Sequence, residues 1–328
     1  MPGNTDFPST LARARKPPAR PATVWHGRTS PLRAWSLASL AHVCLALISL
    51  PLFASVELRQ ADGSVLTLPG PAKSLITLAP HLTELVFAAG AGDRIVATVE
   101  FSDFPAPAAG IPRVGDAFRL DLERILTLKP DLVIAWQSGN PRAAVAFLES
   151  LGIPTWTVEI RHPEDIATVL EAIGLASGST RSARESAEKT RKRVRELTAL
   201  YTGLPAVTYF YQVAENPLYT INGDHLISRS LALCGARNIF NDAAGLAPMV
   251  SRESVLAANP QALLAPAGPP QSDPLLAWRD WPAMQAVKSG ALFLLPPDEI
   301  SRATPRLFDA VAKGCELLHR IRTRSPHE

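Results

Sequence analysis

The chain of 328 residues has few of the residue types from which metal centres and disulfide scaffolds are built, with three cysteines and seven histidines. It contains neither a His-Glu-x-x-His motif nor a histidine-rich loop, which argues against a zinc enzyme and against a metal-ion receptor. His81 has no visible partner, and a lone histidine of this kind is more often a loop residue than a base or ligand. The sequence therefore predicts no catalytic residue and no metal site, and it disfavours an enzyme.

A strong charge of one sign is also absent from most of the chain. Residues 1–33 hold six Lys and Arg residues but only one acidic residue, Asp6, which leaves 27 basic and 29 acidic groups in the remainder. That near-neutral remainder lacks the basic footprint of a nucleic-acid-binding protein. Because 47% of the residues are hydrophobic and 19% are charged, the composition is that of a globular chain with room for two modest domains.

Residues 1–55 are expected to lie outside the folded protein. The first 33 are rich in Pro, Arg and Ala without apolar periodicity, which is typical of a disordered extension. An apolar run over 34–52 follows, and the small residues Ala54 and Ser55 suit signal cleavage, so we predict an exported chain cleaved near Ala54 to Val56. A retained membrane anchor is the alternative, since the run is borderline in length for a span.

The most informative stretch covers residues 120–140. Leucine and isoleucine recur there at helical spacing behind Asp121, a candidate N-cap, and the pattern ends at Pro130, which does not continue a helix. The apolar run 132–136 that follows has the length of a strand buried on both faces, and a turn comes after it. Ligands of open α/β sheets lie at the carboxyl ends of strands, so Trp136 is predicted to line a ligand site. A core aromatic is the alternative.

The same helix-to-strand pattern occurs a second time at residues 252–265. The two segments align without a gap, and Glu123 and Glu253 stand at the same distance before a proline. A looser match in the same order links residues 82–90 with residues 226–235. The period is too long for a solenoid, so we predict one duplicated α/β unit that forms two lobes with a ligand cleft between them.

Strands and helices alternate along the rest of the chain, which predicts the α/β class. The expected strands are 56–60 and 64–68, paired as a hairpin, then 74–78, 94–99, 155–158, one starting at 209, and 292–295. Expected helices are 82–89, 141–151 and one starting at 304, and expected loops are 266–274 and 296–302. Segment 181–201 has no Pro or Gly and carries apolar residues at steps of three and four, which predicts one long connecting helix. We expect an N-terminal lobe over 56–177, a linking helix over 178–203 and a C-terminal lobe over 204–328.

Taken together, these residues resemble the substrate-binding proteins of ABC importers for vitamin B12, haem and iron chelates, in which two Rossmann-like α/β lobes are joined by one helix. The resemblance covers about residues 72–320 and is strongest to the members that bind vitamin B12. The runs that carry it are 122–125, 128–136, 139–140, 234–235, 238–240, 250–253, 255–257, 298, 302–303 and 305–306. It implies a monomeric periplasmic receptor, without enzymatic activity, that captures cobalamin or a related corrinoid and delivers it to an ABC permease dimer with its ATPase. A haem or iron-siderophore receptor of the same fold is the alternative.

Three sets of site residues follow from the resemblance. The ligand-binding residues it implies are Phe101, Phe118, Trp136, Tyr219, Asp298 and Arg302. Glu123 and Glu253 correspond to permease-docking carboxylates, although either one alone could be a solvated first-turn residue. Cys234 and Cys315 correspond to a disulfide, which suits an oxidising compartment.

The sequence also departs from the vitamin B12-binding members in two places. Ala117 and Ala247 stand where those members have tryptophan, so the aromatic floor of the site is thinner. This weakens the prediction of intact cobalamin relative to a related corrinoid. Arg302 also has a simpler interpretation, in which it is only a surface ion-pair partner of Asp298.

Overall fold

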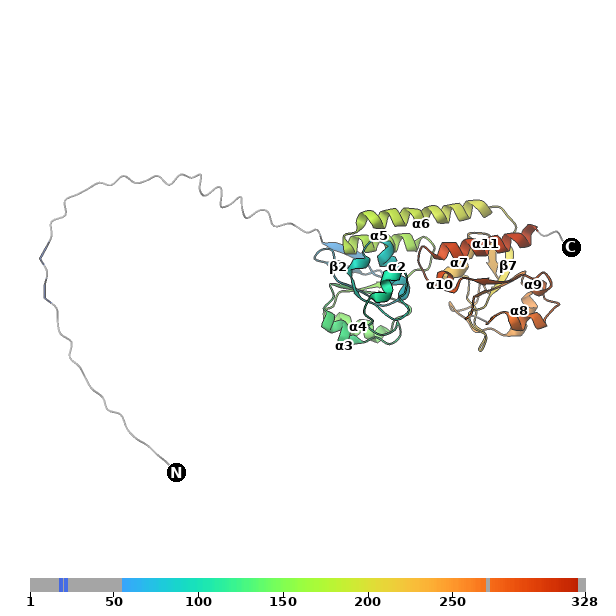
Figure 1. Cartoon of the computed structure of the whole chain (residues 1–328), viewed down its shortest axis with the longest axis horizontal. Coiled ribbons are helices and arrows are strands. Elements are labelled where there is room, and N and C mark those ends of the chain that lie inside the picture. Colours follow the sequence, from blue (N-terminus) through green and yellow to red (C-terminus); the bar gives the residue numbers. More distant parts are fainter. Residues whose placement is uncertain (1–17, 20, 23–54, 270–271, 324–328) are drawn as a thin grey trace, which may run out of the picture. The chain divides into compact units, whose positions relative to one another are not determined.

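The computed structural model describes residues 18–19, 21–22, 55–269 and 272–323. The chain divides into a unit Met1–Leu52 and a unit Phe53–Glu328, and only the second is discussed below (Figure 1). The predicted disordered extension and signal run fall almost entirely outside the described residues. Within the described ranges, no helix has both the length and the apolar character needed to cross a membrane.

The second unit begins with the predicted β-hairpin, which is confirmed. β1 (Val56–Arg59) pairs antiparallel with β2 (Val65–Leu68). A four-stranded parallel sheet follows, in the order β4-β3-β5-β6. Its strands are β3 (Leu75–Thr77), β4 (Ile95–Ala97), β5 (Leu132–Trp136) and β6 (Thr155–Val158). Nearly every residue of these strands is buried, as expected for a parallel sheet covered on both faces. We call this sheet with its helices the first lobe.

A second parallel sheet repeats the first. It consists of β7 (Val207–Tyr211), β8 (Ala236–Asn238), β9 (Ala262–Pro266) and β10 (Leu292–Leu295), in the order β10-β9-β7-β8. Read from the other edge this order is β8-β7-β9-β10, which matches β4-β3-β5-β6 strand for strand. The predicted duplicated α/β architecture is therefore present in the topology, although β8 had not been expected. We call this sheet with its helices the second lobe.

Ten α-helices are described in this part of the chain. In the first lobe they are α2 (Pro80–Ala88), α3 (Leu122–Leu128), α4 (Arg142–Ser150) and α5 (Asp165–Ser177). The long helix α6 (Thr180–Tyr201) comes next. The others are α7 (Leu226–Ala232), α8 (Arg252–Ala258), α9 (Gln285–Lys288), α10 (Pro297–Ser301) and α11 (Leu307–Thr323). The helical turns η1 (Gly92–Arg94), η2 (Ala106–Gly110) and η3 (Leu276–Asp280) complete the description.

Several elements differ from the sequence-based expectations. The structure contains α5, which was not predicted, and α10, which lies inside the predicted loop 296–302. Helix α2 begins at Pro80, because proline is tolerated in the first helical turn, where its missing N–H costs no hydrogen bond. Pro141 precedes α4 as its N-cap instead of occupying its first turn, and α11 begins at Leu307 instead of residue 304.

One hydrophobic cluster connects the two lobes along α6. It contains buried residues from α2, α5, α6, α7 and α11, whereas the opposite face of each sheet packs on a separate cluster under α3 and α4 or under α8. Helix α6 packs along α5 and also contacts α11 (Figure 1). Arg191 of α6 donates two hydrogen bonds, of 2.7 and 2.6 Å, to the Glu171 carboxylate of α5. The long predicted helix is thus anchored by packing as well as by an ion pair.

The second lobe contains the disulfide implied by the sequence. Cys234, just after α7, is bonded to Cys315 of α11, with the two Cα atoms 5.5 Å apart and a sequence separation of 81. Both cysteines are fully buried. The bond therefore holds α11 against the helix that follows the first strand of its sheet.

Candidate functional site

A cavity of about 390 Å³ lies between the two lobes. The first lobe contributes residues at or just after the carboxyl ends of all four of its strands, including His81, Phe101, Trp136 and Glu159. The second lobe contributes the start of α7, the loop after β8 and the end of α10, including His225, Ala247 and Arg302. The volume is within the range of small-molecule and cofactor sites. The cavity lies where the carboxyl ends of both parallel sheets converge, which is the expected place for a ligand in such folds.

Trp136 is held in this cavity by the turn that follows β5. The Asn140 side chain accepts a 2.6 Å hydrogen bond from the Trp136 backbone N–H and donates 2.8 Å bonds to the carbonyls of Leu78 and Ala117. Gly139 packs so closely on the indole that a Cβ atom there would overlap the ring. The prediction that Trp136 lies at a ligand-facing strand end is consistent with this placement, because its backbone and ring are both fixed while the ring stays half-buried.

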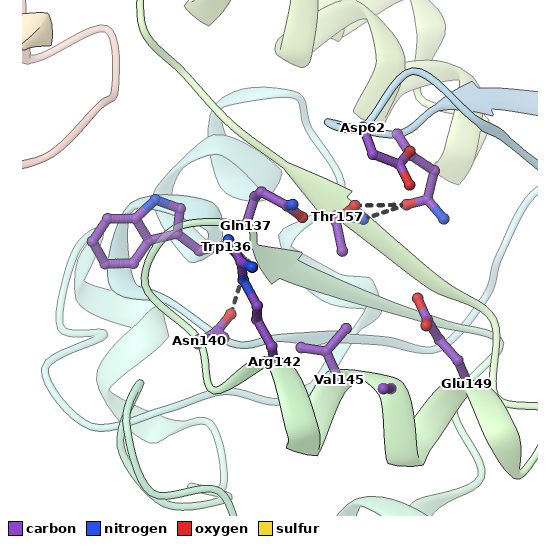
Figure 2. Close-up of a pocket in the computed structure, with 10 residues that line it drawn as sticks. Asp62, Trp136, Gln137, Asn140, Arg142, Val145, Glu149 and Thr157 are labelled. Atoms are coloured by element: carbon purple, nitrogen blue, oxygen red, sulfur yellow. Dashed lines mark hydrogen bonds between the residues drawn. The ribbon is translucent and has the colours of Figure 1, made fainter.

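Trp136 also lines a smaller cavity of about 150 Å³ in the first lobe. Figure 2 shows its indole at one side of this cavity and Asp62 and Glu149 at the other. The side-chain oxygen of Gln60 accepts hydrogen bonds from the backbone N–H and the hydroxyl of Thr157. Gln137, Asn140 and Val145 also line this cavity. Trp136 therefore lines both the interlobe cavity and this smaller cavity of the first lobe.

Phe101 projects from the loop after β4 and is 74% exposed, with a backbone φ of 65°. A left-handed conformation is costly for a residue with a bulky side chain, so the surrounding structure must hold it. Beneath this loop the hydroxyls of Thr77, Thr83, Thr98 and Ser102 form a buried network with distances between 2.6 and 3.2 Å. This network anchors the loop that presents Phe101 to the cavity.

Arg302 lines the cavity but is already engaged by carboxylates of both lobes. Its Nη1 lies 2.7 Å from Glu84 of α2 and 2.9 Å from Asp103, and its Nη2 lies 3.3 Å from Asp298. Burial of Asp103 opposes ionisation, but the hydrogen bond and charge of Arg302 outweigh it, so the pKa of Asp103 is lowered. Arg302 is thus more than a surface partner of Asp298, because it connects the two lobes.

Arg306 reinforces the same contact between the lobes. Its guanidinium lies 3.7 Å from the centroid of the Phe104 ring and 3.4 Å from the Glu84 carboxylate. It also pairs with Glu299 at 2.9 Å. The buried carboxylate of the first lobe therefore faces two arginines of the second.

The structure separates the six predicted ligand residues into two groups. Phe101, Trp136 and Arg302 line the interlobe cavity. Phe118, Tyr219 and Asp298 lie outside the cavity lining. Phe118 is 69% exposed in the loop before α3, and Tyr219 is half-buried in bridges to Ala214 and Met249. Asp298 contacts Arg302, which does line the cavity. A ligand role for all six residues stays a prediction.

Two histidines also line the cavity: His81, which the sequence analysis interpreted as a loop residue, and His225, which it did not single out. His81 lies in the first turn of α2, and His225 is the N-cap of α7, the corresponding helix of the second lobe. Burial lowers the pKa of each to about 4, and the charge of Arg302 contributes to the shift of His81. The looser internal repeat, which begins one residue after each histidine, was the signal that could have paired them.

Glu123 and Glu253 occupy equivalent positions in the two lobes. Each is the second residue of a seven-residue helix, α3 or α8, and each is exposed. Asp121 caps the first helix and Ser251 the second through hydrogen bonds of 3.0 and 3.1 Å, and the two helices end in left-handed residues with φ of 45° and 44°. The equivalence predicted from the repeat thus extends to caps and termini.

The surroundings of Glu253 favour the ionised form of its carboxylate. Glu253 accepts hydrogen bonds from its own backbone N–H and from the Ser251 hydroxyl, and these lower its pKa.

Over the described ranges 55–269 and 272–323, no three His, Cys, Asp or Glu side chains gather as a metal-binding group.

Comparisons with known proteins agree with this architecture. The sequence profile of the periplasmic binding protein family matches residues 75–299. The vitamin B12-binding protein of Vibrio cholerae serotype O1 is 38% identical over 260 residues, which cover 78% of this chain and 92% of the relative. The crystal structure of the periplasmic vitamin B12 binding protein of Vibrio cholerae superposes with a TM-score of 0.72 at 37% identity, covering 77% of this chain and 99% of that chain.

A periplasmic heme binding protein from Pseudomonas aeruginosa shares the fold, with a TM-score of 0.67 at 21% identity over 78% of this chain and 95% of that chain. At that identity the likeness concerns architecture alone. The profile match and the 38% identical relative each span most of the two lobes. The chain therefore belongs to the periplasmic binding protein family.

Proposed function

We propose that this protein is the periplasmic receptor of an ABC importer and that it captures cobalamin or a related corrinoid. The observation that carries the proposal is the interlobe cavity with Trp136 fixed at its wall by Asn140 and Gly139. Similarity to a vitamin B12-binding protein over both lobes supports the same ligand class. Within the described cavity lining, no serine hydroxyl is hydrogen-bonded to His81 or His225, so we propose a binding protein and not an enzyme.

The chemistry of the cavity suits a macrocycle with a neutral amide periphery. Phe101, Trp136 and Ile227 offer apolar surface for the ring. Glu159 already accepts hydrogen bonds from Ser138, and Asp224 is paired with Arg229. A carboxylate has further lone pairs, with which either side chain can accept a hydrogen bond from an amide N–H group. Ala247 also lines the cavity but offers no aromatic surface.

A haem or iron-siderophore receptor is the second candidate, since the fold also serves haem binding proteins. Haem carries carboxylates and would need uncommitted cations. Both arginines of the described cavity lining already form ion pairs. Arg302 pairs with Glu84 and Asp103, and Arg161 pairs with Glu159 at 3.8 Å. This charge balance favours a neutral corrinoid over an anionic porphyrin.

Delivery would use the two equivalent carboxylates. Glu123 and Glu253 sit on matching helices of the two lobes, so they suit a permease dimer that presents the same patch twice. Charged pairs of this kind mainly steer the encounter and set the register of docking. In this proposal the receptor acts as a monomer, with one lobe for each permease subunit.

Isothermal titration of the mature protein with cyanocobalamin, cobinamide and haem tests the ligand. We expect saturable binding of a corrinoid at one site per chain and weaker or no binding of haem. Tight haem binding without corrinoid binding would reverse the order of the two candidates. Mass spectrometry of exported protein tests the predicted periplasmic form, which should begin near Val56.

A further inference from the structure

A second polar contact joins the lobes, between Arg229 of α7 and His162, which precedes α5. The Nη1 atom of Arg229 lies 2.8 Å from Nδ1 and 3.0 Å from Nε2 of the imidazole. Asp224 fixes the guanidinium, because its carboxylate and its carbonyl accept hydrogen bonds of 2.7 and 3.1 Å from Arg229. The Asp165 carboxylate accepts a 2.8 Å bond from the backbone N–H of His162. We call the pair of Arg229 and His162 the rim contact.

The rim contact adjoins the interlobe cavity without lining it. Arg161, the neighbour of His162 in sequence, and Asp224, the partner of Arg229, both line the cavity. His162 and Arg229 themselves are absent from the described cavity lining. Replacing either of them therefore removes no side chain from the lining, and an effect on ligand affinity would act through the contact between the lobes.

The rim contact is weaker than the other polar contact at the cavity. Arg302, with a side chain 12% exposed, lies against the Glu84 carboxylate, which is 3% exposed, and against Asp103. In the rim contact His162 is exposed, and its imidazole faces Arg229 where Arg302 faces carboxylates. Breaking a buried ion pair costs several times more free energy than breaking an exposed pair. If the lobes separate, the rim contact is therefore the first of the two to break.

The cavity is small for the proposed ligand. Its volume of about 390 Å³ is near the lower end of the range of about 300 to 1,000 Å³ for sites of drug-sized molecules. A corrinoid, a macrocycle with amide-bearing arms, is larger than a drug-sized molecule. Binding it between the lobes therefore requires a wider cleft, and the cleft widens at the lowest cost in free energy where the rim contact yields.

We propose that the rim contact acts as a clasp, which holds the unliganded cleft narrow and opens when a corrinoid binds, while Arg302 stays paired with Glu84. This rests on the proposed corrinoid-binding function and adds two residues outside the cavity that set its affinity. Because the contact stabilises only the unliganded state, it weakens ligand binding. The competing explanation is a surface contact that stays formed when the ligand is bound.

Isothermal titration with cyanocobalamin tests the clasp in the mature protein, in His162→Ala, in Arg229→Ala and in the double variant. We expect the dissociation constant to fall by about twofold to fivefold in each single variant, the factor that corresponds to an exposed polar pair. The double variant should show no larger change, since both substitutions remove the same contact. Arg195→Ala is the matched control, because it breaks an exposed 2.7 Å ion pair within α6, away from the cavity lining, and should leave the constant unchanged.

Spin labels measure the spacing of the lobes directly. Cysteines introduced by Ser150→Cys at the end of α4 and Lys288→Cys at the end of α9 place one label at an exposed site of each lobe. In the unliganded protein we expect His162→Ala and Arg229→Ala to shift the label distance toward the value with cyanocobalamin bound. Arg195→Ala should keep the parental distance.

A dissociation constant that is unchanged or raised in both single variants would overturn the clasp, and so would additive changes in the double variant. Label distances that are identical with and without cyanocobalamin would overturn it as well. In each of these outcomes the corrinoid still binds, so the proposed function stands. If the parental protein binds neither cyanocobalamin nor cobinamide, the proposed function fails, and a label distance that His162→Ala leaves unchanged would then separately show that the rim contact does not hold the lobes.

Discussion

The carboxylate of Glu84 in the first lobe and the guanidinium of Arg302 in the second lobe are 2.7 Å apart, although their sequence separation is 218. The Glu84 side chain is only 3% exposed. A buried charge of this kind is tolerated only when it is paired, and Arg306 supplies a second partner at 3.4 Å. The pair therefore makes the relative position of the lobes dependent on ion pairing next to the cavity.

Glu84→Gln should destabilise the protein by about 1.5 to 3 kcal/mol, the range for hydrogen bonds to charged groups, because it removes the most buried carboxylate from Arg302, which keeps Asp103 and Asp298 as partners. Urea unfolding measures this. Glu188→Gln is a matched control, since it breaks an exposed pair with Arg195 of similar length, 2.7 Å, and should cost about 0.5 kcal/mol or less. Equal losses in the two variants would show that burial does not strengthen the interlobe pair.

Trp136→Ala should weaken corrinoid binding by about 1 to 3 kcal/mol, the range for losing a buried apolar anchor. Gly139→Ala should weaken it as well, because a Cβ at that position would displace the indole. Trp281→Ala, at a half-exposed tryptophan outside the cavity lining, is the control. A dissociation constant unchanged by Trp136→Ala would remove this residue from the site.

Reduction of the disulfide between Cys234 and Cys315 should lower the melting temperature of the mature protein. In the chain-entropy estimate, a loop of this length contributes on the order of 4 kcal/mol to the free energy of unfolding. The 81-residue separation places the whole second sheet except β7 inside the loop. Two free thiols titrating in unfolded, unreduced protein would contradict the bond.

The pH dependence of stability should contain a contribution from the two cavity histidines. Their pKa values fall from an ordinary 6.5 to about 4 on folding, so the unfolded chain binds more protons than the folded one between these values. The free energy of unfolding should therefore rise with pH from about 4 to about 6.5 and lose this dependence above. Replacing either histidine with Gln should reduce the slope by at most about 1.4 kcal/mol per pH unit in urea titrations. Variants with the parental slope would indicate ordinary pKa values in the fold.

Replacing Glu123 and Glu253 together with Ala should impair uptake and weaken association with the permease in a salt-sensitive way, because the charges act in docking. Ligand binding by titration should stay intact, since both residues lie outside the cavity lining. The single variants are informative controls, because equivalent positions should give similar partial losses. Loss of ligand binding with normal docking would assign the two carboxylates to the ligand site.

Local patterns in the sequence were sufficient to predict the repeated helix-to-strand unit. The N-cap at Asp121, the stop at Pro130 and the apolar run of β5 each depend on neighbouring residues, so they could be recognised without knowledge of the fold. The same was true of α6, where 22 residues without Pro or Gly show a clear apolar stripe. Short elements such as β8 and α10 were missed because three to five residues carry too little periodicity.

By itself the sequence determined the two α/β lobes, the connecting helix and the equivalence of Glu123 and Glu253. The internal repeat and the spacing of apolar residues are properties of the residue order alone. Only the tertiary structure decided which side chains meet at the cleft. It brought Arg302 to Glu84, placed His81 against Trp136 and left Phe118 exposed outside the cavity lining. These contacts join segments far apart in sequence, and they depend on strand order and on how one lobe faces the other, which no local pattern encodes.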